Sequence, residues 1–206
     1  MNHRRITLVP LLFVFGVFLT ACSVLPRAQS VPVERYTLEV PPPDAQPASG
    51  DAVLLVTRPQ ARADLDTPRM AYRQQDYTVR YFARSRWADA PAQLLLPGLI
   101  ESLEASGAFA AVVRVGSAAT PALRLDSELL DFSQDFRVEP SVFRVRLRVQ
   151  LVDLTSRAVI ASRIFEMSRP APEQSPYGGA QAANAAWQAL LPELVGFAAD
   201  AVSVPR

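Results

Sequence analysis

Reactive side chains are scarce in this chain of 206 residues, and both of the most reactive ones lie near its start. The only histidine is His3, the only cysteine is Cys22, and lysine is absent, so all 21 basic residues are arginines. Nucleophilic catalysis, zinc binding and Schiff-base chemistry all depend on histidine, cysteine or lysine. What Cys22 does therefore decides most of the chemistry that the chain can perform.

The segment around Cys22 has the features of a secretion signal. Arg4 and Arg5 precede an uncharged, mostly apolar run over residues 6–19, which is shorter than the roughly 20 residues that a membrane-spanning helix needs. The sequence Leu-Thr-Ala-Cys that follows resembles the bacterial lipobox. This resemblance implies cleavage between Ala21 and Cys22, a diacylglycerol on the Cys22 sulfur and an acyl chain on the new amino group. The alternatives are an ordinary signal peptide with a coincidental cysteine and a short uncleaved anchor.

Cleavage at this point leaves a mature chain with little catalytic chemistry. Removing residues 1–21 takes away His3 and two of the 21 arginines, so 19 arginines face 20 acids. With Cys22 acylated, neither imidazole nor thiol remains, and the sequence has no Asp-x-Asp-x-Asp-Gly run and no glycine-rich phosphate loop. We predict no catalytic residue, no metal and no cofactor apart from the covalent lipid on Cys22. The enzymatic alternative needs Asp131 and Asp135 to act as a carboxylate pair.

The same reading predicts where the protein resides. Acyl chains contribute about 0.8 kcal/mol per buried methylene, so several of them hold a protein firmly on a bilayer. Ser23 follows the cysteine, and in bacteria that retain lipoproteins with Asp at this position, Ser implies release to the outer membrane. We therefore expect a protein anchored by lipid on the periplasmic face of the outer membrane. Its near-neutral charge gives no reason to expect a nucleic-acid partner.

Three segments follow from these observations: a lipoprotein signal peptide (1–21), a lipidated N-terminus with its spacer (22–33) and a folded domain (34–206). Alternation of apolar residues in the domain predicts strands at residues 35–40, 52–56, 70–72, 77–82, 110–115, 123–128, 143–151 and 158–167. A loop is expected where three prolines open residues 41–50, and hairpin turns are expected over residues 73–76 and 153–157.

Two helices complete the predicted fold. The first has Asp89 as its N-cap, Pro91 in its first turn and Gly107 at its end, and with its flanking strands it is expected to form a crossover unit. The second covers about residues 180–202, follows a loop over 169–179, and should be kinked or divided by Pro192. The fold class is α+β: a single domain with a mostly antiparallel or mixed sheet packed by two main α-helices.

Two groups of residues are candidates for binding a partner. Alternation places Arg144, Arg146 and Arg148 on one face of a strand, where they can receive an acidic partner or a phospholipid headgroup. The alternative is a cross-strand ladder in which these arginines pair with acids of the same sheet, drawn from Asp126, Glu128, Asp131 and Glu166.

The second group stands at the predicted entrance to the first helix. Arg84, Arg86 and Trp87 are of the residue types that dominate interface hot spots, because they combine large contact area with directional hydrogen bonds. In the alternative reading Trp87 packs beneath the helix and Arg86 covers it.

The order of several motifs resembles one protein family. Cys22 in its lipobox, Tyr36-Thr37-Leu38, Arg86-Trp87-Ala88 with Pro91, the leucines from Leu94 to Leu103, and Ser106-Gly107-Ala108-Phe109 look like the ABC-type transport auxiliary lipoprotein family. The likeness extends over most of residues 36–202 and is strongest over 81–113.

That resemblance implies a periplasmic domain that docks on a mammalian-cell-entry (MCE) protein, as in the paraquat-inducible system, and helps to move phospholipids or related lipids between membranes. Direct contact with phospholipid and self-association into a homo-oligomer are left open. Two other functions compete with this one: an outer-membrane assembly lipoprotein, like the plug of the lipopolysaccharide translocon, and an activator of a peptidoglycan synthase.

Overall fold

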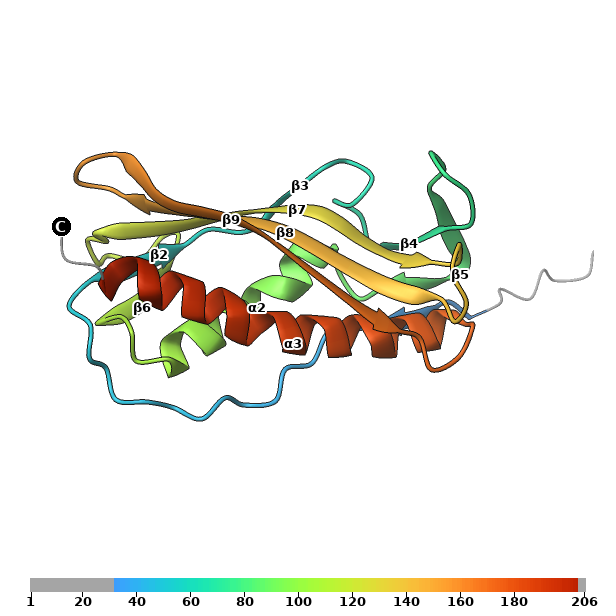
Figure 1. Ribbon diagram of the computed structural model, residues 1–206, viewed down its shortest axis with the longest axis horizontal. Helices are drawn as coiled ribbons and strands as arrows, with labels where there is room; N and C mark the ends of the chain where they lie inside the picture. The colour runs from blue at the N-terminus through green and yellow to red at the C-terminus, as the bar shows by residue number, and fades with distance from the viewer. Residues whose placement is uncertain (1–31, 204–206) are drawn as a thin grey trace, which may run out of the picture. The chain divides into compact units, whose positions relative to one another are not determined.

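The computed structural model describes residues 32–203 of the chain. The predicted signal peptide, Cys22 and nearly all of the spacer lie outside these residues. By its internal contacts the chain divides into two units after residue 32, and the second of them, residues 33–206, is compact. The second unit is an α+β domain, as predicted, with one mixed sheet of nine strands and two helices among the described residues (Figure 1).

The described elements follow one another along the chain as β1 (Glu34–Tyr36), β2 (Val53–Val56), β3 (Gln60–Ala61), β4 (Arg69–Arg73), β5 (Arg80–Trp87), α2 (Pro91–Ala105), β6 (Ala111–Arg114), β7 (Leu123–Asp135), β8 (Val142–Asp153), β9 (Ala158–Pro170) and α3 (Pro176–Ser203). The predicted strand over 35–40 is thus only three residues long and ends before the proline-rich segment. Strand β5 is longer than predicted and carries the chain to Trp87.

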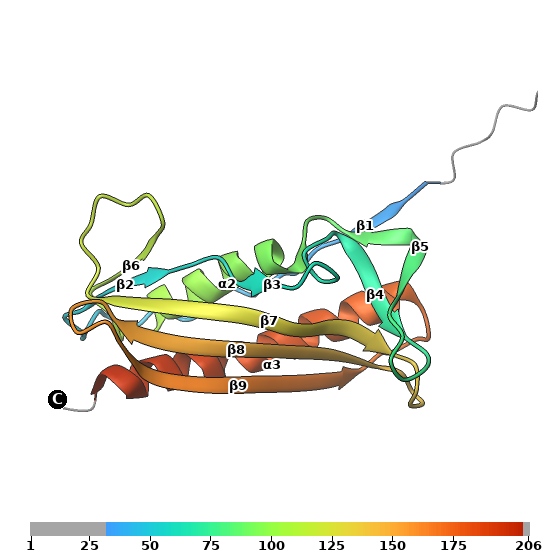
Figure 2. The same cartoon turned by 90° about the horizontal axis from the view of Figure 1, so that it is seen from above.

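Strand β7 is the centre of the sheet. Along one side it pairs antiparallel with β8, which in turn pairs antiparallel with β9, so the last three strands form an antiparallel meander (Figure 2). Along its other side β7 pairs in parallel with β2, β3 and β4, one after another. Strands β4 and β5 form the predicted hairpin, and β1 adds to β5.

The expected crossover around α2 is wrong in its pairing. The strands that flank this helix, β5 and β6, are not neighbours: β6 pairs in parallel with β2, while β5 pairs with β4 and β1. Helix α2 therefore carries the chain across the width of the sheet instead of joining two adjacent strands.

Both helices cover the same face of the sheet (Figure 1), because alternation puts the large apolar side chains of the strands on that face. Trp87, Phe132 and Phe143 form the aromatic centre of the core, with ring centroids 5.1 Å apart for Trp87 and Phe132 and 4.8 Å apart for Phe132 and Phe143. From the helix side, Leu95, Leu99 and Leu103 of α2 are fully buried in the same cluster.

Both ends of α2 depend on the residues beside them. The N-cap residue is Ala90 instead of the predicted Asp89, because the Asp89 carboxylate accepts a hydrogen bond from the backbone N–H of Ala90 at 2.7 Å and so caps no residue inside the helix. At the other end Gly107, which was predicted to end the helix, has a φ of 65°, in the left-handed region that glycine adopts without strain.

The proline-rich segment 41–50 is a loop, as predicted, but it is held against α2. The Gln46 N–H donates to the carbonyl oxygen of Ala105, and the Ser49 N–H donates to that of Gly107, each at 2.7 Å. These bonds use carbonyls at the C-terminal end of the helix that have no partner within it. We call residues 41–50 the strap.

Helix α3 is longer and less interrupted than the sequence predicts. Strand β9 extends to Pro170 and the helix begins at Pro176, so the predicted loop over 169–179 is much shorter than expected. The helix is also continuous through Pro192, which is exposed, so that water can satisfy the carbonyl that the proline leaves without a donor. Within residues 32–203, neither helix has the length and apolar content needed to cross a bilayer.

Candidate docking surfaces

The face of the sheet opposite the helices is polar, and its charges are mostly paired. Arg148 of β8 forms an ion pair with Glu128 of β7, and Arg146 pairs with Glu166 of β9 at 3.5 Å. Arg144 contacts Asp135 at 3.0 Å and Glu166 at 3.8 Å. The three predicted arginines of β8 thus lie on one face, and each has a carboxylate partner inside the molecule, as the cross-strand reading predicts.

Asp135, at the end of β7, is the most strongly held of these acids. Its side chain is 1% exposed and accepts hydrogen bonds from Arg137 at 2.8 Å and from Arg144 at 3.0 Å. The Arg137 guanidinium is the main reason why the pKa of this carboxyl lies well below its usual range, and Arg144 lowers it further. Arg137 also pairs with Asp76, which ties the β7–β8 connection to the β4–β5 connection.

The structure separates the members of the second predicted group. Trp87 is 1% exposed and packs on Phe132 and Phe143, so it lies in the core and is not available to a partner. Arg84 and Arg86 are exposed on the opposite side of β5, because their positions alternate with the buried Ser85 and Trp87.

Register brings two further arginines to this group. Arg35 of β1 and Arg69 of β4 both lie directly opposite Arg86, one on each side of β5. Sequence reasoning missed both, because only the strand pairing places Arg35 and Arg69 beside Arg86.

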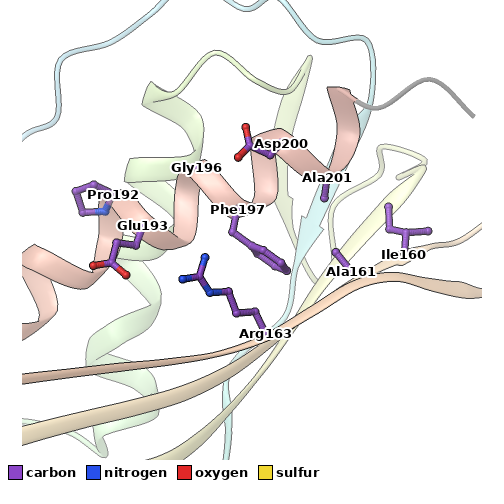
Figure 3. A pocket seen from close by; sticks show the side chains of 9 residues that line it. All are labelled: Ile160, Ala161, Arg163, Pro192, Glu193, Gly196, Phe197, Asp200 and Ala201. Carbon is purple, nitrogen blue, oxygen red and sulfur yellow. The ribbon is translucent and has the colours of Figure 1, made fainter.

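A groove lies between the C-terminal half of α3 and strand β9, with a cavity volume of about 890 Å³ (Figure 3). Phe197 extends from the helix toward the strand, and its ring lies 5.5 Å from that of Phe165. Arg163 faces the groove from β9, while Glu193 and Asp200 flank it on the helix. The groove was not predicted, although small residues beside Phe197, such as Gly196 and Ala201, leave room for it.

The acidic residues of the described part of the chain do not form a metal centre. Within residues 32–203, no three side chains of the types His, Cys, Asp and Glu stand close enough to hold one metal ion.

Comparison with known proteins identifies the family. A family model described as the ABC-type transport auxiliary lipoprotein component matches residues 36–195. The chain belongs to this family. Membership confirms the resemblance seen in the motifs and makes the protein a lipoprotein component associated with an ABC-type transport system.

Solved structures extend the comparison to the fold. A crystal structure of a Xanthomonas campestris protein is 25% identical, with a TM-score of 0.73, and the alignment covers 84% of this chain and 97% of that one. A crystal structure of an uncharacterized protein, 12% identical with a TM-score of 0.63, covers 81% and 98% of the two chains. A hypothetical protein from Chlamydia trachomatis, 14% identical with a TM-score of 0.50, covers 73% and 98%. The latter two share the fold alone. A search of curated proteins found no match.

Proposed function

We propose that this auxiliary lipoprotein acts without catalysis, as an outer-membrane-anchored docking component of an MCE-type ABC system that moves phospholipids or related lipids between the two membranes. The observation that carries the proposal is the family match over residues 36–195 together with a lipobox cysteine upstream of it. Paired charges and a carboxylate with a lowered pKa favour binding over acid–base chemistry, because a carboxyl general acid needs its pKa raised.

The proposed mechanism is positional. Lipid on Cys22 fixes one end of the chain to the bilayer, and residues 23–33 form a spacer that reaches at most about 3.5 Å per residue. The domain that follows is thereby kept close to the membrane. Confinement of this kind raises the effective concentration of a docking surface for its partner and can strengthen binding by roughly 10²–10⁴ without any new contact.

The tether is tested by replacing Cys22 with alanine behind an ordinary cleavable signal, so that the domain is exported but carries no lipid. We expect complementation of a deletion strain to fall sharply, because the effective concentration is lost. The control is Glu101→Gln, at an exposed position of α2, which should complement fully. Full complementation by the untethered protein, combined with failure of the carboxylate variant, would contradict the positional mechanism.

The partner is tested by crosslinking and co-purification from membranes. We expect an MCE-domain protein to be captured, together with the permease and ATPase of its system. Capture of an outer-membrane barrel protein would favour the assembly lipoprotein, and stimulation of a peptidoglycan synthase in vitro would favour the activator. Either result without an MCE protein would replace the proposal.

A further inference from the structure

Three arginines from three neighbouring strands stand in one row. Arg35 of β1 lies opposite Arg86 of β5 in the parallel pairing, and Arg69 of β4 lies opposite Arg86 in the antiparallel pairing. Residues directly opposite one another share a face of the sheet, and Arg84, two positions before Arg86, points to the same side. We call these four residues the arginine row; all of them are exposed.

The row differs from the arginines of β8 because it lacks carboxylate partners. Among the ion pairs of residues 32–203, none involves Arg35, Arg69, Arg84 or Arg86. Arg69 lies over the ring of Tyr81, with its guanidinium carbon 3.8 Å from the ring centroid. The nearest acid on β1, Glu34, belongs to the opposite face and accepts a hydrogen bond from the Tyr36 hydroxyl. Like charges directly across strands destabilise a sheet, so the row favours an external anion.

The place of the row in the molecule indicates what supplies that anion. Strand β1 is the first element of the domain, so the row stands where the chain arrives from the spacer. Figures 1 and 2 both show that this end of the long axis also carries the β4–β5 connection, the β7–β8 connection and the start of α3.

Exposed apolar side chains gather at the same end. Among residues 32–203 there are seven exposed large hydrophobic residues, and four of them lie at this end: Val33 just before β1, Tyr77 and Val138 in the two connections, and Tyr177 at the start of α3. Tyr77, at the tip of the β4–β5 hairpin, is fully exposed and has a φ of 63°. Arginines beside exposed tyrosine and valine suit the interface of a bilayer, where phosphate groups and the upper acyl region lie within a few ångströms of each other.

We propose that this end of the domain lies on the surface of the bilayer, with the arginine row on the phosphates of anionic phospholipids and Tyr77 at the headgroup level. The proposal rests on the proposed function in one respect: the bilayer is the one that holds the lipid on Cys22. A folded acidic protein is a weaker fit, because the four apolar residues come from four separate segments: the residue before β1, the β4–β5 and β7–β8 connections, and the first turn of α3.

The test uses residues 23–206, which contain the whole compact unit and lack the anchor, so that binding comes from the domain alone. Sedimentation with large unilamellar vesicles compares phosphatidylcholine alone with phosphatidylcholine mixed with phosphatidylglycerol. The variant is Arg35→Glu with Arg86→Glu. The matched control is Arg114→Glu with Arg157→Glu, two exposed arginines without ion pairs among the described residues. Arg114 ends β6 and Arg157 lies in the β8–β9 connection, and Figure 2 shows both of these elements at the other end of the domain.

We expect the unaltered domain to bind only the anionic vesicles. It should dissociate from them near 1 M salt, where the screening length is about 3 Å. Each arginine near an anionic surface raises the partition coefficient onto the vesicles about fivefold. The row variant, which loses two arginines, should therefore bind at least ~25-fold more weakly. In this double variant the glutamate at position 86 lies opposite Arg69 on one side and the glutamate at position 35 on the other, so one like-charge pair replaces another and the sheet should keep its stability. Thermal unfolding checks this.

Three results overturn the proposal: no binding of the unaltered domain to anionic vesicles, equal binding by the row variant, or an equal loss in the control, which would show that net charge alone is responsible. Because the assay contains neither transport partner nor lipid anchor, its failure leaves the proposed docking on an MCE protein standing. Conversely, vesicle binding can be confirmed even if a different partner is captured from membranes.

Discussion

At the scale of single residues, Asp135 is the clearest case of a carboxylate that organises its neighbours. It is buried, it accepts hydrogen bonds from Arg137 and Arg144, and Arg137 in turn reaches Asp76 on another connection. One acid therefore holds together the ends of β7 and β8 and the β4–β5 hairpin. Asp131, its partner in the enzymatic alternative, is instead occupied by the Ser133 hydroxyl, which donates to it at 2.7 Å.

Replacing this acid should lower stability in a way that depends on pH. Asp135→Asn should reduce the free energy of unfolding at neutral pH by about 1–3 kcal/mol, since it leaves two arginines without their shared anion. Because the pKa of Asp135 is lowered in the folded state, its contribution is complete above roughly pH 4 and declines as the pH falls further. Urea unfolding across this range should show a smaller acid-induced loss in the variant.

The control is Asp76→Asn, which removes the other partner of Arg137. The Asp76 side chain is 70% exposed, so this change should alter stability by less than about 1 kcal/mol. Equal losses in the two variants would show that burial of Asp135 contributes nothing.

The sequence predicted the arginine ladder better than the arginine row. Alternation along β8 placed its three arginines on one face beside acids of the next strands, because a single long strand fixes that pattern by itself. The row joins β1, β4 and β5, and the β4–β5 pairing shifts its register between Arg69 and Ala71. No local pattern encodes that shift, so Arg35 and Arg69 could not be assigned to the surface that includes Arg86.

At the scale of elements, the strap is the segment whose role the sequence concealed. Prolines at 41–43 predicted a loop correctly, yet the loop is bonded to the last turn of α2 and lies beside α3. A Cβ on Gly107 would come within 2.3 Å of the Pro47 carbonyl oxygen, so this glycine permits the close approach of strap and helix.

Gly107→Ala should therefore lower the free energy of unfolding by more than a left-handed alanine does at a position where no other atom lies nearby. The conformation alone accounts for about 1–2 kcal/mol, and displacement of the strap should add to this. The control is Gly116→Ala, where φ is 93° and no atom lies within 4 Å of the added Cβ. Thermal unfolding of the two variants measures the difference. Equal losses of stability would mean that displacing the strap does not destabilise the domain.

At the scale of the whole molecule, the predicted fold class was right while the connections were not. Long alternating strands and a leucine-rich helix identify an α+β domain, since these patterns are local. The parallel pairing of β2, β3 and β4 with β7 joins residues that are about 60–70 positions apart in the chain. Such pairings depend on how helices and strap pack on the sheet, which the periodicity of any one segment does not contain.

The folded unit should be independent of the segment that precedes it. Residues 33–206 are expected to unfold cooperatively at a Tm within about 2 °C of that of residues 23–206, because the core lies entirely after residue 33. Calorimetry of the two chains makes the comparison. A clearly lower Tm for the shorter chain would reveal stabilising contacts from the spacer.

The central place of β7 also governs the order in which the protein is assembled. A ribosome delivers β2, β3 and β4 well before residues 123–135, yet each of these early strands has β7 as a neighbour in the finished sheet. Until β7 arrives, their backbone donors and acceptors on that side stay unmatched, and pairing across such a span is slow to form. The nascent chain consequently has unpaired strand edges for a long interval, and this is the stage at which binding by a chaperone protects it most.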